Sequence, residues 1–163
     1  MKKFLFLCLF ALFFCSGFAQ SQKPQENNQA LVQRIDSLEH ELSYLKLSYD
    51  LYTLNSDMKM AANEIYAKYL AIREDIDHRN FAKELGNAYK RYYKLCEGQK
   101  ESFDKLIKAK KDYFAIKVVT YPYSENEMGV LKANYEIIDN AYDSLESSIE
   151  LLKIAIDTYY KFL

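Results

Sequence analysis

The sequence is poor in the residues that break helices and build turns. Its 163 residues include only four glycines and two prolines, and tryptophan is absent. A domain made of β-strands needs a turn every few residues, and such turns rely on glycine and proline. The scarcity of both therefore argues against a strand-rich fold and predicts an all-α protein.

Cysteine is also scarce, and two of the three cysteines lie in the first nineteen residues. Cys96 is the third and cannot form a disulfide within the rest of the chain. It is either a buried small hydrophobic residue or a link between chains, and burial is our expectation because free cysteine is among the most buried residue types.

The first nineteen residues have the pattern of a signal peptide. Lys2 and Lys3 precede an apolar run over residues 4–14, and small residues lead to Ala19. The pattern resembles the export signals of Gram-negative bacteria and predicts cleavage after Ala19, which releases the protein into the periplasm or the extracellular space. The run has 11 residues, whereas a membrane-spanning helix needs about 20, so we expect no stable membrane insertion after cleavage.

A lipid anchor is the alternative use of this segment, through Cys15. We do not expect it, because the bulky Phe14 stands directly before Cys15, where lipid attachment prefers a small residue. The segment is therefore interpreted as an export signal that is removed.

The rest of the chain divides into a polar lead and one helical domain. Residues 20–28 are polar, contain Pro24 and lack apolar spacing, so we predict a disordered lead. From residue 29 to residue 163, apolar residues recur every three or four positions, which predicts amphipathic helices. We predict a single domain, an elongated antiparallel three-helix bundle that resembles a coiled coil.

Three long helices are expected, over residues 30–76, 81–119 and 125–163. Pro122 ends the second helix, because proline cannot continue one. Ser124 and Glu127 then have the spacing of a capping box at the start of the third. The apolar rhythm weakens near Asn55, where we predict a bend, and at Gly98, where a weakened helix is favoured over a turn that would give a four-helix bundle.

Each predicted helix carries an apolar row with steps of three and four. The row of the third helix is Met128, Leu131, Tyr135, Ile138, Tyr142, Leu145, Ile149, Leu152, Ile156, Tyr159 and Leu163. The row of the second is Phe81, Leu85, Ala88, Tyr92, Leu95, Leu106, Tyr113 and Ile116. The first helix starts with Leu31, Ile35, Leu38, Leu42, Leu45, Tyr49 and Tyr52, and resumes through Ala62, Ile65, Tyr69, Ile72 and Ile76.

Charge is distributed unevenly along the chain. Residues 83–117 hold ten basic and five acidic side chains, whereas residues 20–82 hold seven and ten, and residues 125–163 hold three and eight. A basic middle helix between two acidic helices favours antiparallel neighbours. Since each exposed ion pair contributes only about 0–1 kcal/mol, these charges select neighbours more than they stabilise.

No pattern in the sequence indicates catalysis or a cofactor, and we expect a non-enzymatic protein without a metal site. Asp75 and His78 have a spacing similar to that of ferritin-like di-iron bundles, but only one such pair is present. An acidic ridge on the third helix is interpreted as a solvated face or as a partner of the basic helix. It consists of Glu136, Asp139, Asp143, Glu146 and Glu150. Export and a net charge of −1 give no reason to expect nucleic acid as a partner.

The expected function is that of an exported interaction or scaffold protein, which binds another protein or itself along a helical face. The expected binding face is the apolar row from Leu31 to Tyr52, near the free N-terminus, because an apolar seam left in water is unfavourable. The alternative is an extracytoplasmic holdase or adaptor, since size and export signal are similar to those of small periplasmic chaperones with long helical arms. Those chaperones are basic and contain strands, unlike this chain. A weaker alternative is a metal- or cofactor-binding helical bundle.

Overall fold

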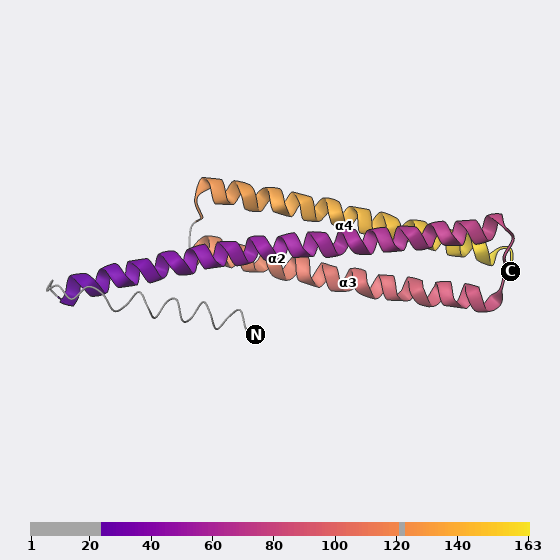
Figure 1. Ribbon diagram of the computed structural model, residues 1–163, viewed down its shortest axis with the longest axis horizontal. Helices are drawn as coiled ribbons and strands as arrows, with labels where there is room; N and C mark the ends of the chain where they lie inside the picture. The colour runs from indigo at the N-terminus through magenta and orange to yellow at the C-terminus, as the bar shows by residue number, and fades with distance from the viewer. Residues whose placement is uncertain (1–23, 121–122) are drawn as a thin grey trace, which may run out of the picture. The chain divides into compact units, whose positions relative to one another are not determined.

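The computed structural model describes residues 24–120 and 123–163, which form three helices and no strand. The order is α2 (Pro24–Asp77), α3 (Lys83–Thr120) and α4 (Glu125–Tyr160), as Figure 1 shows. The predicted all-α fold with three long helices is confirmed. The predicted signal peptide, residues 1–19, lies outside the described residues, and so does the Pro122 turn.

The chain separates into two units, residues 1–39 and residues 40–163. In the first unit the described residues, 24–39, are helical and form the beginning of α2. Helix α2 therefore starts at Pro24, and helix replaces the predicted disordered lead at residues 24–28. Proline is tolerated in the first turn of a helix, because the backbone N–H that it lacks would have no partner within the helix there.

Within the second unit, α3 runs antiparallel to both α2 and α4. Hydrogen bonds between residues distant in sequence establish these directions, because they join the end of one helix to the start of the next. The pairs are Ser43 with Tyr113 and Asp75 with Tyr89 between α2 and α3, and Lys110 with Tyr135 and Asn87 with Tyr160 between α3 and α4.

The predicted row of α4 forms one side of the core. Seven of its eleven residues are buried, namely Leu131, Ile138, Leu145, Ile149, Leu152, Ile156 and Tyr159. Met128, Tyr135 and Tyr142 are half-buried and pack against the core. Only Leu163, beyond the end of the helix, is half exposed. An unbroken apolar rhythm thus predicted the inner face of α4 correctly.

The inner row of α2 differs from the prediction in its first half. Leu47, Leu51, Leu54 and Met58 are buried, and their steps of four and three continue directly into Ala61, Ala62, Ile65 and Ile72. The apolar rhythm of the buried face therefore has no interruption near Asn55, and α2 continues through this residue. The apolar rhythm looks weaker near Asn55 in the sequence because the exposed row before residue 52 and the buried row after it are different rows.

The prediction for α3 also needs correction. The correction concerns its inward face, because the helix itself continues through Gly98, as favoured from the sequence, without the turn that would make a four-helix bundle. Leu95, Leu106 and Ile116, predicted to face inward, are all exposed. The buried side chains on this helix are Tyr89, Cys96 and Phe103. Cys96 points inward and its neighbour Leu95 does not. Because the prediction followed the larger hydrophobic side chain, it placed the inward face one position too early.

The predicted break after α2 is a tight turn of a known type. The Asn80 N–H donates to the Asp75 carbonyl and the Arg79 N–H donates to the Ile76 carbonyl, which is the hydrogen-bond pattern of a Schellman motif. Arg79 has a φ of 56°, in the left-handed region where glycine is usual. The turn therefore satisfies the last carbonyls of α2 at the expense of a strained backbone at Arg79.

The start of α4 is capped as predicted. The Ser124 hydroxyl accepts from the Glu127 N–H, and the Glu127 carboxylate accepts from the Ser124 N–H at 2.8 Å. The Ser124 hydroxyl also donates to the Glu127 carboxylate at 2.7 Å. This hydrogen bond and the one from the Ser124 N–H, together with a weaker one from His40, lower the pKa of Glu127. Two backbone N–H groups that lack a partner inside the helix are thus satisfied reciprocally.

Ion pairs join the basic α3 to both acidic neighbours. Lys110 pairs with Asp50 on α2, and on α4 Lys100 pairs with Glu146 and Lys111 with Asp139. This agrees with the charge distribution along the sequence. Burying one leucine side chain contributes about 1.5–3 kcal/mol, more than an exposed ion pair, so the apolar core dominates the stability.

Candidate interaction surface

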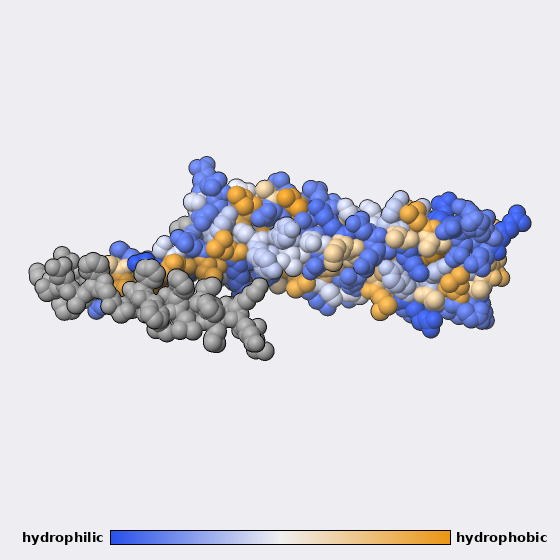
Figure 2. All heavy atoms as spheres, in the orientation of Figure 1, coloured by the Kyte–Doolittle hydropathy of each residue, from blue (hydrophilic) through white to orange (hydrophobic). Residues whose placement is uncertain are grey.

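The apolar row predicted as a binding face is exposed along its whole length. We call it the α2 stripe: Leu31, Ile35, Leu38, Leu42, Leu45, Tyr49 and Tyr52. The exposed fraction of these side chains lies between 52% and 69%. In Figure 2, hydrophobic atoms gather over the N-terminal part of α2, while on the rest of the visible face they are scattered among hydrophilic ones.

The helical repeat explains why these residues are exposed in the second unit. Successive residues of an α-helix are rotated by about 100°, so residues two apart point in nearly opposite directions. Leu47 and Leu51 are almost fully buried, at 1% exposure each. Leu45 and Tyr49, two positions earlier, therefore point away from the core. This part of α2 carries two apolar faces, of which the bundle covers only one.

A polar cluster holds the covered face of α2 against the other helices. The Ser43 hydroxyl lies 3.2 Å from the hydroxyl of Tyr113 and 3.4 Å from that of Tyr123, and His40 Nε2 lies 3.4 Å from Glu127 Oε2. Sequence reasoning missed this cluster, because its members are far apart in the sequence and belong to no motif. It lies on the same side of α2 as the buried Leu47 and Leu51.

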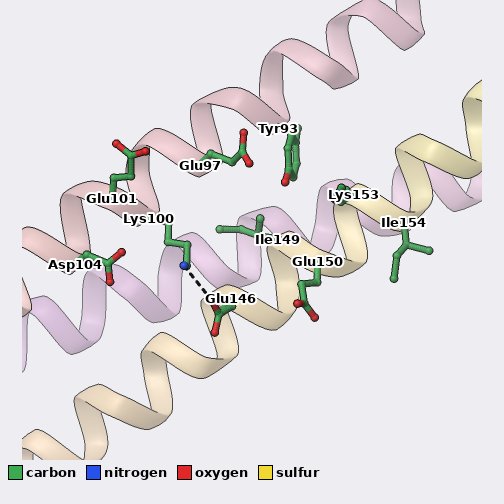
Figure 3. Close-up of a pocket in the computed structure, with 10 residues that line it drawn as sticks. All are labelled: Tyr93, Glu97, Lys100, Glu101, Asp104, Glu146, Ile149, Glu150, Lys153 and Ile154. Carbon is green, nitrogen blue, oxygen red and sulfur yellow. Dashed lines mark ion pairs between the residues drawn. The ribbon is translucent and has the colours of Figure 1, made fainter.

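A groove of about 580 Å³ lies between α3 and α4, as Figure 3 shows. Its sides carry five carboxylates and two lysines, and an ion pair of 3.0 Å joins Lys100 to Glu146 across it. Hydrogen bonds to Tyr142 and Glu146 raise the pKa of Lys100. The groove is thus lined mainly by charges that face water, and its central lysine is held by the opposite helix.

The acidic ridge of α4 lies beside this groove and is exposed. Two of its members, Asp139 and Glu146, pair with lysines of α3, as expected for a helix that complements a basic neighbour. In the part of the chain that the structure describes, no group of three or more His, Cys, Asp or Glu side chains is placed to hold a metal ion.

Cys96, Asp75 and His78 are the single residues that the sequence offered as candidates for a reactive thiol or a metal ligand. Cys96 is buried, and burial raises the pKa of its thiol, which disfavours the reactive thiolate. Asp75 accepts hydrogen bonds from the Tyr89 hydroxyl and from the Asn80 side chain, while His78 is exposed in the turn after α2. Asp75 therefore ties the turn to α3.

None of the helices in the described residues has a stretch long and apolar enough to cross a membrane. Comparison with known proteins gives no further assignment: no family model, curated protein or solved structure matches this chain.

Proposed function

We propose that this chain is an exported, non-enzymatic interaction protein, which acts in the periplasm or outside the cell. It binds another protein, or a second copy of itself, through the α2 stripe. One observation carries the proposal: seven apolar side chains at heptad spacing on one helix are all more than half exposed. Contiguous exposed apolar residues mark interaction surfaces, because leaving them in water is unfavourable.

Site-specific photo-crosslinking in living cells tests the proposal. A photoreactive amino acid replaces Leu45 or Tyr49 in the stripe, and Leu95 on α3 serves as the matched control. Leu95 is 71% exposed, and the residues one turn away on each side, Arg91 and Gln99, are polar. We expect covalent adducts with a protein from both stripe positions and none from the control. Equal yields at stripe and control positions would contradict the proposal.

A holdase is the second candidate, supported by exposed apolar side chains outside the stripe. Examples on α3 and α4 are Ile116, Val119 and Ile154, which are at least 60% exposed. A holdase binds many unfolded chains through dispersed apolar surface, whereas a specific partner needs one continuous face. Suppression of the aggregation of several unfolded substrates, unaffected by Leu45→Glu, would favour the holdase.

A further inference from the structure

We propose that the α2 stripe binds the α2 stripe of a second copy of this chain, in a parallel, in-register, two-stranded coiled coil. This inference rests on the proposed function and specifies its partner. Three features carry it: the composition of the stripe, the charges beside it, and the separation of the stripe from the core.

The stripe has the composition of a coiled-coil seam. In the heptad notation abcdefg, positions a and d form the seam. Leucine occupies three of the four d positions, and a β-branched residue, Ile35, occupies an a position. Isoleucine or valine at a with leucine at d favours two parallel strands. The seam residues are Ile35, Leu42 and Tyr49 at a, and Leu31, Leu38, Leu45 and Tyr52 at d.

Asn28 extends this register toward the N-terminus. It stands seven residues before Ile35, which is the preceding a position, and it is exposed on α2. A single asparagine at an a position specifies the register and the oligomeric state of a coiled coil. After Tyr52 the next a and d positions are Ser56 and Lys59, so the seam ends there.

The charges that flank the seam select a parallel arrangement. In a parallel in-register pair, a residue at g faces the e residue five positions later on the partner. Arg34 then faces Glu39 of the second copy, and Glu41 faces Lys46. Both contacts join opposite charges, and two-fold symmetry doubles them to four. Glu41 and Lys46 are exposed on α2.

The second copy does not compete with the bundle. In residues 40–54 of α2, the residues that pack inward are Ser43, Leu47, Leu51 and Leu54. They occupy positions b, c and f of the same heptad, which lie on the outside of a two-stranded coiled coil. One helix can therefore contribute to the bundle and to the dimer at the same time.

Charge exchange tests the partner and the orientation together. The chain is purified as it is recovered after export, and sedimentation equilibrium at micromolar concentrations measures association. We expect a dimer whose dissociation constant rises about tenfold in Glu41→Lys and in Lys46→Glu, because each change turns two attractive contacts into repulsive ones. An equimolar mixture of the two variants restores the affinity through a heterodimer. Asp36→Lys, at an exposed b position, is the control and leaves the dimer unchanged.

Disulfide trapping tests the register at both ends of the stripe. In a parallel in-register pair, each d residue meets its own copy, so Leu31→Cys and Tyr52→Cys each form a disulfide-linked dimer under mild oxidation. In an antiparallel pair, neither end of the stripe meets itself. A dimer that neither cysteine traps, or one that Glu41→Lys leaves intact, overturns the parallel arrangement.

A monomer at these concentrations overturns self-association altogether. The proposed function fails separately, when the crosslinker in the stripe gives no adduct with any protein. A monomer whose stripe crosslinks to a different protein therefore refutes this inference and leaves the proposed function standing.

Discussion

Two apolar rows of nearly equal regularity have opposite environments in this protein. The row of α4 packs inside the bundle, where Leu131, Leu145 and Leu152 have no exposed surface. The α2 stripe has the same steps of three and four, and every member is more than half exposed. The periodicity of apolar residues shows which face of a helix is apolar. It does not show whether the covering surface belongs to the same chain.

Truncating one leucine in each row gives the largest expected contrast. Leu145→Ala removes a fully buried side chain, and we expect it to lower the free energy of unfolding by about 2–5 kcal/mol at every protein concentration. Leu45→Ala removes an exposed side chain and costs little in dilute solution. Its cost increases with protein concentration, because association through the stripe stabilises the folded chain by mass action.

Urea denaturation of both variants at two protein concentrations measures this contrast. Tyr44→Phe, a small change beside the stripe, controls for general effects of substitution on α2. A cost of Leu45→Ala that matches that of Leu145→Ala in dilute solution would show that the bundle itself covers the stripe.

Removing a hydroxyl from each row sharpens the comparison. Tyr159 is fully buried, and its hydroxyl accepts from the Ala82 N–H at 2.8 Å and donates to the Asn80 carbonyl at 2.9 Å. Tyr159→Phe leaves these backbone groups in the turn between α2 and α3 without that partner, and we expect a loss of roughly 1–3 kcal/mol. Tyr49→Phe, at 69% exposure, is the matched change in the stripe and leaves stability unchanged. Thermal denaturation of the two variants measures the two losses of stability. Equal losses would contradict the assignment of Tyr159 to a buried face and of Tyr49 to an exposed one.

The sequence predicted the elements of the fold better than their rotation. The capping box at Ser124, the break after residue 77 and the inner face of α4 were all readable, because each depends on local spacing. The inward faces of α3 and of early α2 were not. Cys96 and Ser43 are small side chains that point inward, while larger hydrophobic neighbours point to solvent. Ser43 contacts the distant Tyr113, and no local sequence pattern records such a contact.

The candidate surface was predictable for a related reason. The stripe from Leu31 to Tyr52 is a heptad seam that the sequence shows directly, and the structure adds that the bundle does not cover it. The second row, through Leu47, Leu51 and Leu54, was overlooked because its residues alternate in the sequence with those of the stripe, so that no single face of the helix stands out as apolar. One of the two faces packs in the core of the bundle, and the other is the face through which we propose that the protein binds.

The helix cap at the start of α4 gives the next effect in size. Ser124→Ala removes a hydroxyl that accepts from the Glu127 N–H, and we expect a loss of about 1 kcal/mol at neutral pH. Ser144→Ala is the control, because Ser144 only bonds back to the Asn140 carbonyl within the same helix. Denaturation curves of both variants and the wild type measure the difference.

The contribution of this cap depends on pH in a definite direction. Folding lowers the pKa of Glu127, so the folded chain binds a proton less readily than the unfolded chain. The resulting stability is present above the unfolded pKa and is lost as the pH falls through the lower, folded pKa. The difference in the free energy of unfolding between the wild type and Ser124→Ala is therefore expected to become smaller in acid. A difference in the free energy of unfolding that becomes larger in acid would contradict the capping-box assignment.

The contrast between open and covered faces also predicts different effects on stability when two glycines in α3 are replaced by alanine. A Cβ added at Gly98 meets no atom within 4 Å, so Gly98→Ala gains helix propensity without a clash. We expect it to stabilise the protein by about 0.5–1 kcal/mol. A Cβ added at Gly86 lies 3.0 Å from Leu163 Cδ1 and 3.1 Å from the Tyr160 ring. At that position the gain is offset, because the Leu163 and Tyr160 side chains must shift to make room for the Cβ. Melting temperatures of the two variants test this, and a loss of stability in Gly98→Ala would mean that another surface already covers this face of α3.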